Sequence, residues 1–263
     1  MRPLLERLAW EHRVRLPLAA LFALAWGALI VTFYAYADMT TQTNLGPDQI
    51  RVALRIFGGN WLAIWVGLGA GHPLLLASAG VIACGTSVRS VAGELEGGTL
   101  ELVLTRPVSR ARHLSAYCLF TFGSLAAIAA LYGLGAYLAW RAVHPQPGQL
   151  SAGSLARMSA CLALLLFAVA GYSLLCSALA RERGRALGLA LGLTIGLYAW
   201  NFLASLVGAL APFARISPWY WFNPAAVAGG GAFPVGDALV LGGATIVCVA
   251  LAARAFIRRD LTS

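Results

Sequence analysis

The chain has 263 residues, of which 60% are hydrophobic and only 11% are charged. Soluble domains carry about 25% charged residues, so this composition excludes an ordinary soluble protein and indicates a chain that lies mostly within a membrane. The net charge of +9 comes from 19 basic residues, all of them arginines scattered between apolar runs, which is typical of membrane topology and argues against nucleic-acid binding.

The chain begins with the amphipathic segment RPLLERLAWEHRVR, residues 2–15. Its apolar positions fall mainly on one helical face. These positions are Leu4, Leu5, Leu8 and Ala9. The segment is predicted to form a short interfacial helix on the inner membrane surface, with a frayed charged tail as the alternative.

Six apolar runs follow, and each is long enough to cross a ~30 Å hydrocarbon core as a helix. They cover residues 16–37, 61–84, 114–140, 155–180, 186–212 and 238–256. Gly71, His72 and Pro73 lie near the middle of the second run, so a kink is expected there. The sequence therefore predicts an all-α membrane protein in which residues 1–263 form a single transmembrane domain of six helices.

The arginines fall unevenly on the two sides of these spans. One side holds residues 2, 7, 13, 15, 89, 106, 110, 112, 181, 183, 185, 254, 258 and 259, and the other holds residues 51, 55, 141, 157 and 215. Loops rich in arginine stay in the cytoplasm. Both termini, and the loop between the second and third spans, are therefore predicted to face the cytoplasm from the inner (plasma) membrane.

That loop, VAGELEGGTLELVLTRPVSR at residues 91–110, gathers an unusual amount of charge. Gly97-Gly98 is expected to break or cap the preceding helix. Thr99 can begin a new short helix with Glu101 in its first turn, where a carboxylate suits the helix dipole. Pro107 ends it. The pattern predicts a short helix along the inner membrane face, with an apolar side and a charged side that a partner could grip.

The fifth run carries glycines at every fourth position, at Gly184, Gly188, Gly192 and Gly196. Such a ridge lets another helix approach closely, either from the same chain or from a second copy. The outer segment 212–237 contains SPWYWFNP at residues 217–224. Its prolines disfavour a spanning helix, and its aromatic residues suit the lipid headgroup level. It is predicted to be a re-entrant or interfacial element, or else a plain aromatic belt on a loop.

The sequence lacks the residues that several kinds of binding and catalytic site require. Without lysine the chain cannot carry a G-x-x-x-x-G-K-[ST] phosphate loop, and its four histidines lie in separate segments and form no H-E-x-x-H motif. The five cysteines show no spacing typical of a metal site, so no metal is predicted. The clear ionisable residue within a span is His72, which either lines a transport pathway or bonds a neighbouring helix.

The loop carries a family resemblance. GELEGGTLELVLTRPVSR, residues 93–110, resembles the signature of ABC-2 type permeases, the membrane subunits of ABC transporters. SPWYWFNP also resembles a segment near the last span in this family. The resemblance implies six spans, an N-terminal interfacial helix, an outer re-entrant element before span six, and a coupling helix at about 91–110 that docks on a separate cytoplasmic ATPase.

The resemblance also implies residue roles and partners. The ATPase-coupling interface would comprise Glu94, Glu96, Gly97, Gly98, Thr99 and Glu101. Two ATPase subunits would bind ATP and Mg, leaving no cofactor and no catalytic residue in this chain, and a second permease copy, identical or related, would complete the path in membrane lipid. The alternatives are a membrane-embedded enzyme, an accessory protein or a secondary carrier. The neutral spans favour an amphipathic or lipid-like substrate over a bare ion.

Overall fold

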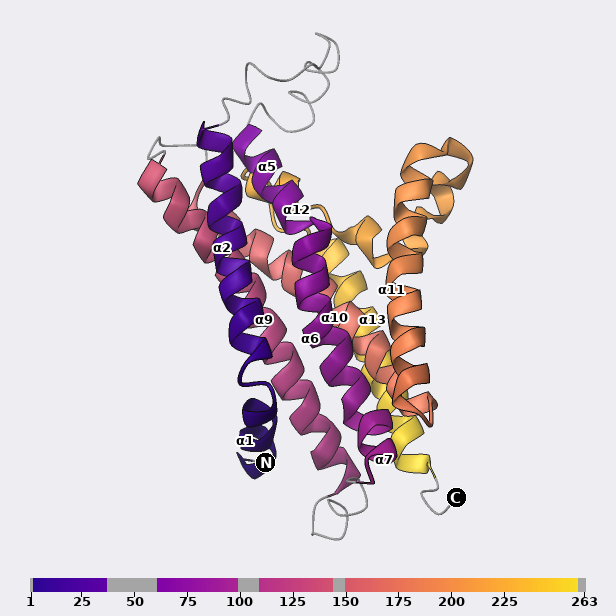
Figure 1. Ribbon diagram of the computed structural model, residues 1–263. Coiled ribbons are helices and arrows are strands. Elements are labelled where there is room, and N and C mark those ends of the chain that lie inside the picture. The colour runs from indigo at the N-terminus through magenta and orange to yellow at the C-terminus, as the bar shows by residue number, and fades with distance from the viewer. Residues whose placement is uncertain (1, 37–60, 99–108, 144–149, 260–263) are drawn as a thin grey trace.

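The computed structural model describes residues 2–36, 61–98, 109–143 and 150–259, and within these ranges the chain is helical with no strand. Figure 1 shows the helices side by side in an elongated bundle. Six helical stretches are long and apolar enough to cross a membrane. They are Arg15–Tyr36 (α2), Trp61–Glu96, Arg110–Val143 (α9), Ala152–Leu179 (α10), Arg183–Leu206 (α11) and Val235–Arg258 (α13). The predicted all-α membrane fold with six spans is confirmed.

The second span consists of four consecutive pieces: α5 (Trp61–Ala70), α6 (Pro73–Val88), the π-helical turn η1 (Arg89–Gly93) and α7 (Glu94–Glu96). The break between α5 and α6 confirms the expected kink. His72 caps α6, because its Nδ1 accepts a hydrogen bond from the backbone N–H of Leu74 at 3.3 Å. The helical path continues twelve residues beyond Cys84, where the apolar run ends.

The fifth helix, α11, ends at Leu206, six residues before the expected end at residue 212. Val207 has an extended backbone, and the 3-10 helix η2 (Gly208–Ile216) follows it. Gly208 and Pro212 both disfavour α-helix. Apolar composition continues through this segment, so composition alone placed the boundary too late.

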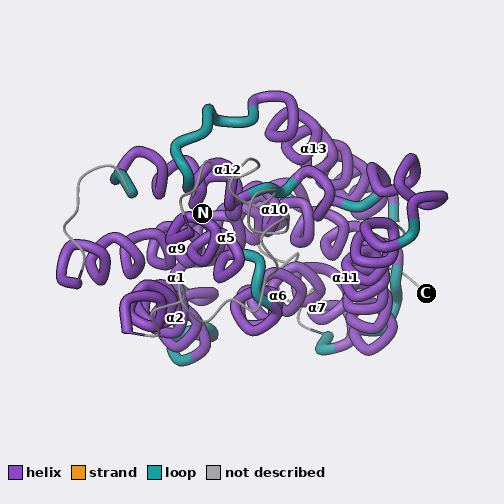
Figure 2. The backbone as a smooth tube through the Cα atoms, turned by 90° about the horizontal axis from the view of Figure 1, so that it is seen from above, coloured by secondary structure: helices purple, strands orange, loops and turns teal. Residues whose placement is uncertain are grey.

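The helices pack around α10, which is the most buried span. Figure 2 looks down the bundle and places α10 near its centre, with α6, α9, α11 and α13 around it. On one side α2 packs extensively against α9. Glycines make that approach possible: a Cβ on Gly27 would lie 2.1 Å from the carbonyl oxygen of Tyr132, and one on Gly135 would lie 2.0 Å from that of Leu24.

Short helices connect α11 to α13 at the end of the bundle opposite the two termini (Figure 1). These are η2, η3 (Pro218–Trp221) and α12 (Pro224–Ala228). Helix α12 packs against α5 and α10, and a Cβ on Gly67 of α5 would lie 2.3 Å from the Cα of Ala225. The segment is thus folded against the bundle, and none of its helices is long enough to span.

Candidate functional site

The end of the bundle that holds both termini also holds a cluster of ionisable side chains, which we call the charge cluster (Figure 1). Its members come from the N-terminal helix α1 (Arg2–Glu11), the lower part of the second span, and α9. They are Arg7, Glu11, Arg89, Glu94 and Tyr117. The cluster joins three elements that are distant in sequence.

Glu94 is the centre of this cluster and is only 1% exposed. Its Oε1 accepts hydrogen bonds from Arg7 Nη2 at 2.8 Å and from the Tyr117 hydroxyl at 2.7 Å. A buried carboxylate is stable only when it is paired and hydrogen-bonded. Glu94 therefore lies inside the protein, which differs from the expectation that it faces a partner.

Arg7 and Glu11 extend the cluster along α1. Arg7 Nε donates to Glu11 Oε1 at 2.9 Å, and Arg89 Nη2 lies 3.1 Å from the same oxygen. Burial disfavours the charged guanidinium, but Glu94 and Glu11 outweigh burial and raise the pKa of Arg7. Two carboxylates and two guanidinium groups thus fasten α1 to the second span.

The π-helical turn η1 is held by the side chain of Ser177 on α10. The Ser177 hydroxyl accepts hydrogen bonds from the N–H groups of Val91 and Ala92, at 3.3 and 3.0 Å, and donates to the carbonyl of Val88 at 2.7 Å. A π turn shifts the helical hydrogen-bond register and often marks a functional position. One buried hydroxyl therefore connects this turn directly to the central helix.

Other side chains tie the remaining helices together at the same end. Arg110, at the start of α9, donates to the carbonyls of Phe256, Ile257 and Arg259, at 3.1, 3.0 and 2.7 Å. Arg259 in turn donates to the carbonyls of Ala178 and Ala180, at 3.0 and 2.8 Å. These carbonyls belong to helix C-termini, where cations are favourable. The lower ends of α9, α10 and α13 are therefore joined.

Glu96 lies on the other side of the same helix and is exposed. Its Oε2 accepts the backbone N–H of Arg183 at 2.6 Å, at the start of α11. Residues two apart on a helix point in nearly opposite directions, so Glu94 faces inward and Glu96 outward. Sequence reasoning had taken both as lying beyond the span, because it ended the helix at Cys84.

The helix ends where expected, at Gly97-Gly98. Gly97 donates to the carbonyl of Gly93 and Gly98 to that of Leu95, both at 3.1 Å, and Gly98 has a φ of 64°, which favours glycine. Both glycines are exposed. Thr99 and Glu101, together with most of the predicted coupling helix, lie outside the described residues.

The glycine ridge of α11 faces away from the rest of the chain. A Cβ on any of the four glycines, Gly184, Gly188, Gly192 and Gly196, would meet nothing within 4 Å. The buried residues of α11 are Ala186, Ala190 and Ala204, which lie on the opposite face. The ridge thus has no neighbour among the described residues, and the close helix contacts inside the chain use Gly27, Gly67 and Gly135 instead.

His72 contacts neighbouring aromatic rings as well as capping α6. It is half-buried, and its ring centroid lies 4.9 Å from that of Trp26 on α2. Its hydrogen bond with Leu74 lies within α6, so a bond to a neighbouring helix and a role in a transport pathway both stay predictions. The five cysteines are free thiols. No group of three His, Cys, Asp or Glu residues suited to a metal occurs in the described ranges.

Sequence reasoning missed Arg7, Tyr117 and Ser177 as members of this region. Polar residues at otherwise apolar positions within spans were the available signal for Tyr117 and Ser177, because buried hydroxyls in membrane helices need partners. Arg7 was counted only as a topology marker. Its partner, Glu94, is 87 residues away, so the pair is visible only once the helices are packed.

The fold and this region define a multi-pass helical membrane protein with a polar, tightly joined end that holds both described chain ends. A family model described as ABC-2 family transporter protein matches residues 26–261. The chain belongs to this family. It is thus a transmembrane transport subunit of an ABC transporter and not the catalytic one, and the family implies association with an ABC ATPase and, typically, dimerisation. No curated protein is similar enough in sequence to be matched.

Proposed function

We propose that a separate cytoplasmic ATPase drives transport through this chain and that its movement enters at the inner end, through a coupling helix at about 91–110. Glu96, Gly97 and Gly98 form the described part of the docking surface. Thr99 and Glu101 would continue it. Two ATPase subunits would bind ATP and Mg, and this chain would supply none of the catalytic residues.

The observation that supports this proposal best is the way the helix end before the loop is fastened. Its inward side is bonded to α1 through Arg7, to α9 through Tyr117 and to α10 through Ser177. Its outward side presents Glu96 and two glycines. A force applied at Gly97-Gly98 would therefore reach three helices through direct hydrogen bonds.

This arrangement gives Glu94 a different role from the one the resemblance implies. Instead of touching the ATPase, Glu94 would transmit movement from the loop to α1 and α9. Packed helices switch between discrete arrangements and do not deform smoothly. Such a link would let a shift of the loop select between two helix arrangements that open the path to different sides.

The orientation rests on the arginine distribution and on the placement of the termini. Both described ends of the chain lie at the end of the bundle that carries Glu96 and Gly98 (Figure 1). Most of the arginines belong to this end, and arginine-rich ends stay in the cytoplasm. The ATPase and both termini would accordingly lie on the cytoplasmic side.

The second permease copy would pack against α11. This helix is poorly buried within the chain, and its glycine ridge faces outward, so another helix could approach closely. The transport path would lie between the two copies. The aromatic segment 217–224 would act as the outer re-entrant or interfacial element beside it.

The coupling proposal is tested by charge reversal at Glu96 and Glu101. The double variant Glu96→Arg, Glu101→Arg is expressed with the partner ATPase, and co-purification and transport-linked ATP hydrolysis are measured. The control is Asp237→Arg, which reverses one carboxylate in the first turn of α13 at the far end and so makes half of that charge change. We expect the double variant to lose at least about tenfold in ATPase affinity, equivalent to ~1.4 kcal/mol.

Unchanged co-purification and hydrolysis in the double variant would show that the ATPase docks elsewhere. An equal loss in the Asp237→Arg control would show a general effect of charge on folding or insertion. Glu94 is left intact in this experiment, because reversing it would break contacts inside the chain and would not report on docking.

A further inference from the structure

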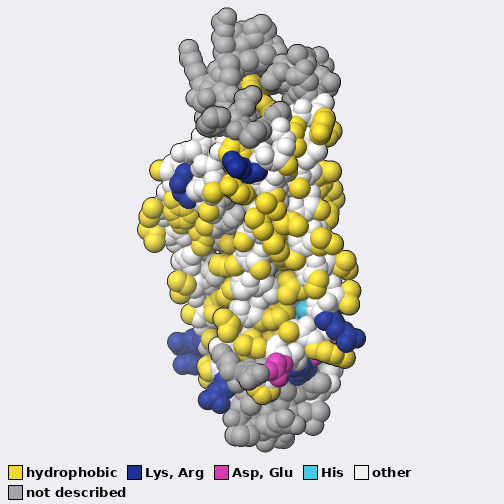
Figure 3. Space-filling view, turned by 90° about the vertical axis from the view of Figure 1, so that its left-hand side faces the viewer, with side chains coloured by type: hydrophobic (Ala, Val, Ile, Leu, Met, Phe, Trp, Pro, Cys, Tyr) yellow, Lys and Arg dark blue, Asp and Glu magenta, His cyan; other side chains and the backbone are white. Residues whose placement is uncertain are grey.

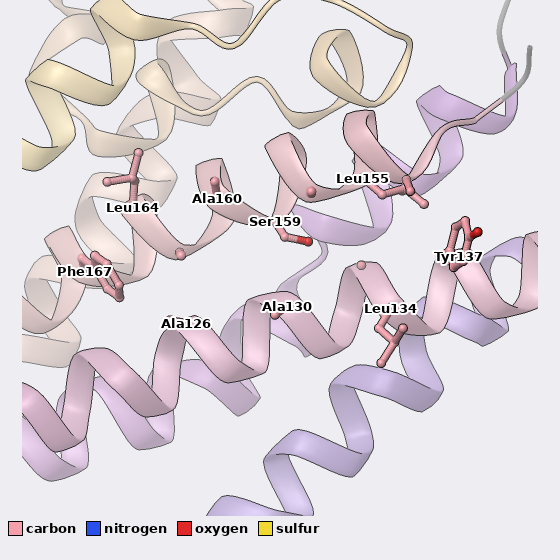
Figure 4. Close-up of a pocket in the computed structure, with 13 residues that line it drawn as sticks. Ala126, Ala130, Leu134, Tyr137, Leu155, Ser159, Ala160, Leu164 and Phe167 are labelled. Atoms are coloured by element: carbon pink, nitrogen blue, oxygen red, sulfur yellow. The ribbon is translucent and has the colours of Figure 1, made fainter.

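Helices α9 and α10 leave a groove between them that the transport proposal does not use. Its volume is about 630 Å³. Small apolar side chains line both walls, as Figure 4 shows for Ala126 and Ala130 on α9 and Ala160 on α10. Larger residues lie toward its two ends, with Phe167 at one and Tyr137 at the other (Figure 4).

The groove has the length of an acyl chain. Its α10 wall runs from Ala152 to Phe167, which is about 22 Å at 1.5 Å per residue. That exceeds half of a ~30 Å hydrocarbon core, the depth of one leaflet. Gly133 lets α9 and α10 approach closely at the floor of the groove, since a Cβ there would lie 2.2 Å from the Ser159 hydroxyl oxygen.

Arg157 lies on α10 close to one end of the groove, although it is not among the residues that line it. Arg157 Nε is buried and has no hydrogen-bond partner within the described ranges, and the residue makes no ion pair there. A Cβ on Gly153 would lie 3.6 Å from Arg157 Nη1, so the guanidinium extends back beside the first turn of α10. That turn provides Ala152, which lines the groove.

Two further features make this end electropositive. The N-terminus of α10, a helix of 28 residues, presents a partial positive charge. Arg141 lies in the last turn of α9 and is exposed, four residues after the groove-lining Tyr137 and thus on the same helical face. Figure 3 shows basic side chains at the upper rim of a broad apolar surface.

We propose that this groove binds a phospholipid with an anionic headgroup, with one acyl chain along α9 and α10 and the phosphate beside Arg157. The apolar walls match the chain, and the Arg157 guanidinium, whose Nε has no hydrogen-bond partner among the described residues, matches the phosphate. A tyrosine at the rim suits the headgroup level. The apolar groove favours a phosphate that carries an acyl chain over a free phosphate. The net positive charge at its end favours an anionic headgroup over a zwitterionic one, in which a cation offsets the phosphate.

The test measures lipid binding to the purified, delipidated complex. Phosphatidylglycerol and phosphatidylcholine with identical chains are titrated, and bound lipid is counted by native mass spectrometry. We expect the wild-type protein to prefer phosphatidylglycerol. Arg157→Gln should lower phosphatidylglycerol affinity by about tenfold, since a charge-assisted hydrogen bond is lost, and should lower phosphatidylcholine affinity less, because choline already offsets the phosphate charge. Arg215→Gln, the same change at an exposed arginine outside the groove, is the control.

A second variant tests the acyl chain. Ala160→Trp should fill the groove and reduce binding of both lipids, whereas Ala244→Trp, on the exposed face of α13, should not. If Ala160→Trp fails to fold, Arg157→Gln still decides the question. Equal phosphatidylglycerol binding in Arg157→Gln and wild type would overturn the proposal, as would an equal loss in Arg215→Gln. Disulfide cross-linking of two copies through Ala160→Cys would also overturn it, because protein would then fill the groove.

Discussion

Glu94 shows how a single side chain can be recognised by its motif and still be misplaced. The motif marks it as important, and the structure surrounds it with a guanidinium and a phenol. Taking a carboxylate out of water costs several kcal/mol unless partners replace the water. The two partners come from α1 and α9, so burial of one carboxylate fixes how two helices sit on a third.

Glu94→Gln should therefore destabilise the protein, because it removes the charge that Arg7 binds. Breaking a fully buried ion pair costs 3–5 kcal/mol, and since the Arg7 side chain is 33% exposed, we expect about 2 kcal/mol. The free energy of unfolding in detergent measures this. Glu96→Gln, on the exposed face of the same helix, should change it by under about 0.5 kcal/mol. Equal effects from the two variants would contradict the internal role of Glu94.

His12 should make the attachment of α1 sensitive to acid. It is buried against Phe120 of α9, with ring centroids 5.4 Å apart. Burial lowers its pKa below the ordinary 6.5, and Arg89 and Arg15 lower it further, while Glu11 opposes them. The folded state therefore binds fewer protons than the unfolded state, so its stabilisation is present above pH ~6.5 and is lost as the pH falls below that value.

Protease cleavage in α1 is accordingly expected to rise between pH 7.5 and pH 5. His12→Phe keeps an aromatic ring beside Phe120 and removes the proton site, so it should abolish the pH dependence. Persistence of the same dependence in His12→Phe would assign it to another group.

At the scale of elements, the sequence defined the spans but not their junctions. Length and apolar composition were enough to count the spans, because any helix in lipid must satisfy its own backbone. The π turn at Arg89–Gly93 gave no comparable signal. Its stability depends on Ser177, 86 residues from Val91, and a contact between distant segments is not encoded in local periodicity.

Ser177→Ala should weaken the junction of the second span with α10. Two buried N–H groups, of Val91 and Ala92, would lose their acceptor, at a cost of about 1–3 kcal/mol. Ser173→Ala is the matched control, one turn away and equally buried, whose hydroxyl bonds the carbonyl of Val169 in its own helix and the Cys84 sulfur of α6 at 3.4 Å. Coupled ATP hydrolysis and thermal unfolding should both suffer more in Ser177→Ala than in Ser173→Ala. The reverse order would show that the π turn does not depend on this hydroxyl.

Glycine spacing identified a ridge on α11, yet the tight contacts within the chain use other glycines. Ala19, Ala23 and Gly27 on α2 also repeat every four residues, and Gly135 and Ala139 do so on α9. These were equally legible as small-residue spacings. Spacing shows that a face is smooth, and only the packed structure shows which partner occupies it.

Substitution of a glycine packed inside the chain and of a glycine on the α11 ridge should have opposite effects. Gly135→Leu should prevent α2 from reaching α9, because even a Cβ would overlap the carbonyl of Leu24, and the single chain should unfold. Gly192→Leu meets open space in the chain and should leave its fold intact while weakening association with a second copy. Size-exclusion chromatography and thermal unfolding separate these outcomes. A normal dimer in Gly192→Leu would remove the ridge from the proposed interface.

At the scale of the whole molecule, the arginine asymmetry and the packed structure agree on one polar, closely joined end. Arg7, Arg89, Arg110 and Arg259 all form contacts there. The arginines that set topology in the sequence therefore also join the helices. Because the same end carries the topology-determining arginines and joins the helices, its orientation decides from which side of the membrane a partner protein can move them.

Cysteine labelling tests that orientation. Glu96→Cys and Arg215→Cys place exposed thiols at opposite ends of the bundle, in a background whose native cysteines are removed. A membrane-impermeant thiol reagent added to intact cells should label Arg215→Cys and leave Glu96→Cys unlabelled, whereas permeabilised cells should label both. The basis is the excess of arginine at the end that carries Glu96, which predicts that this end lies in the cytoplasm. Labelling of Glu96→Cys in intact cells would place the charge cluster outside, where no ATP-driven partner could reach it, and the coupling proposal would fail with the topology.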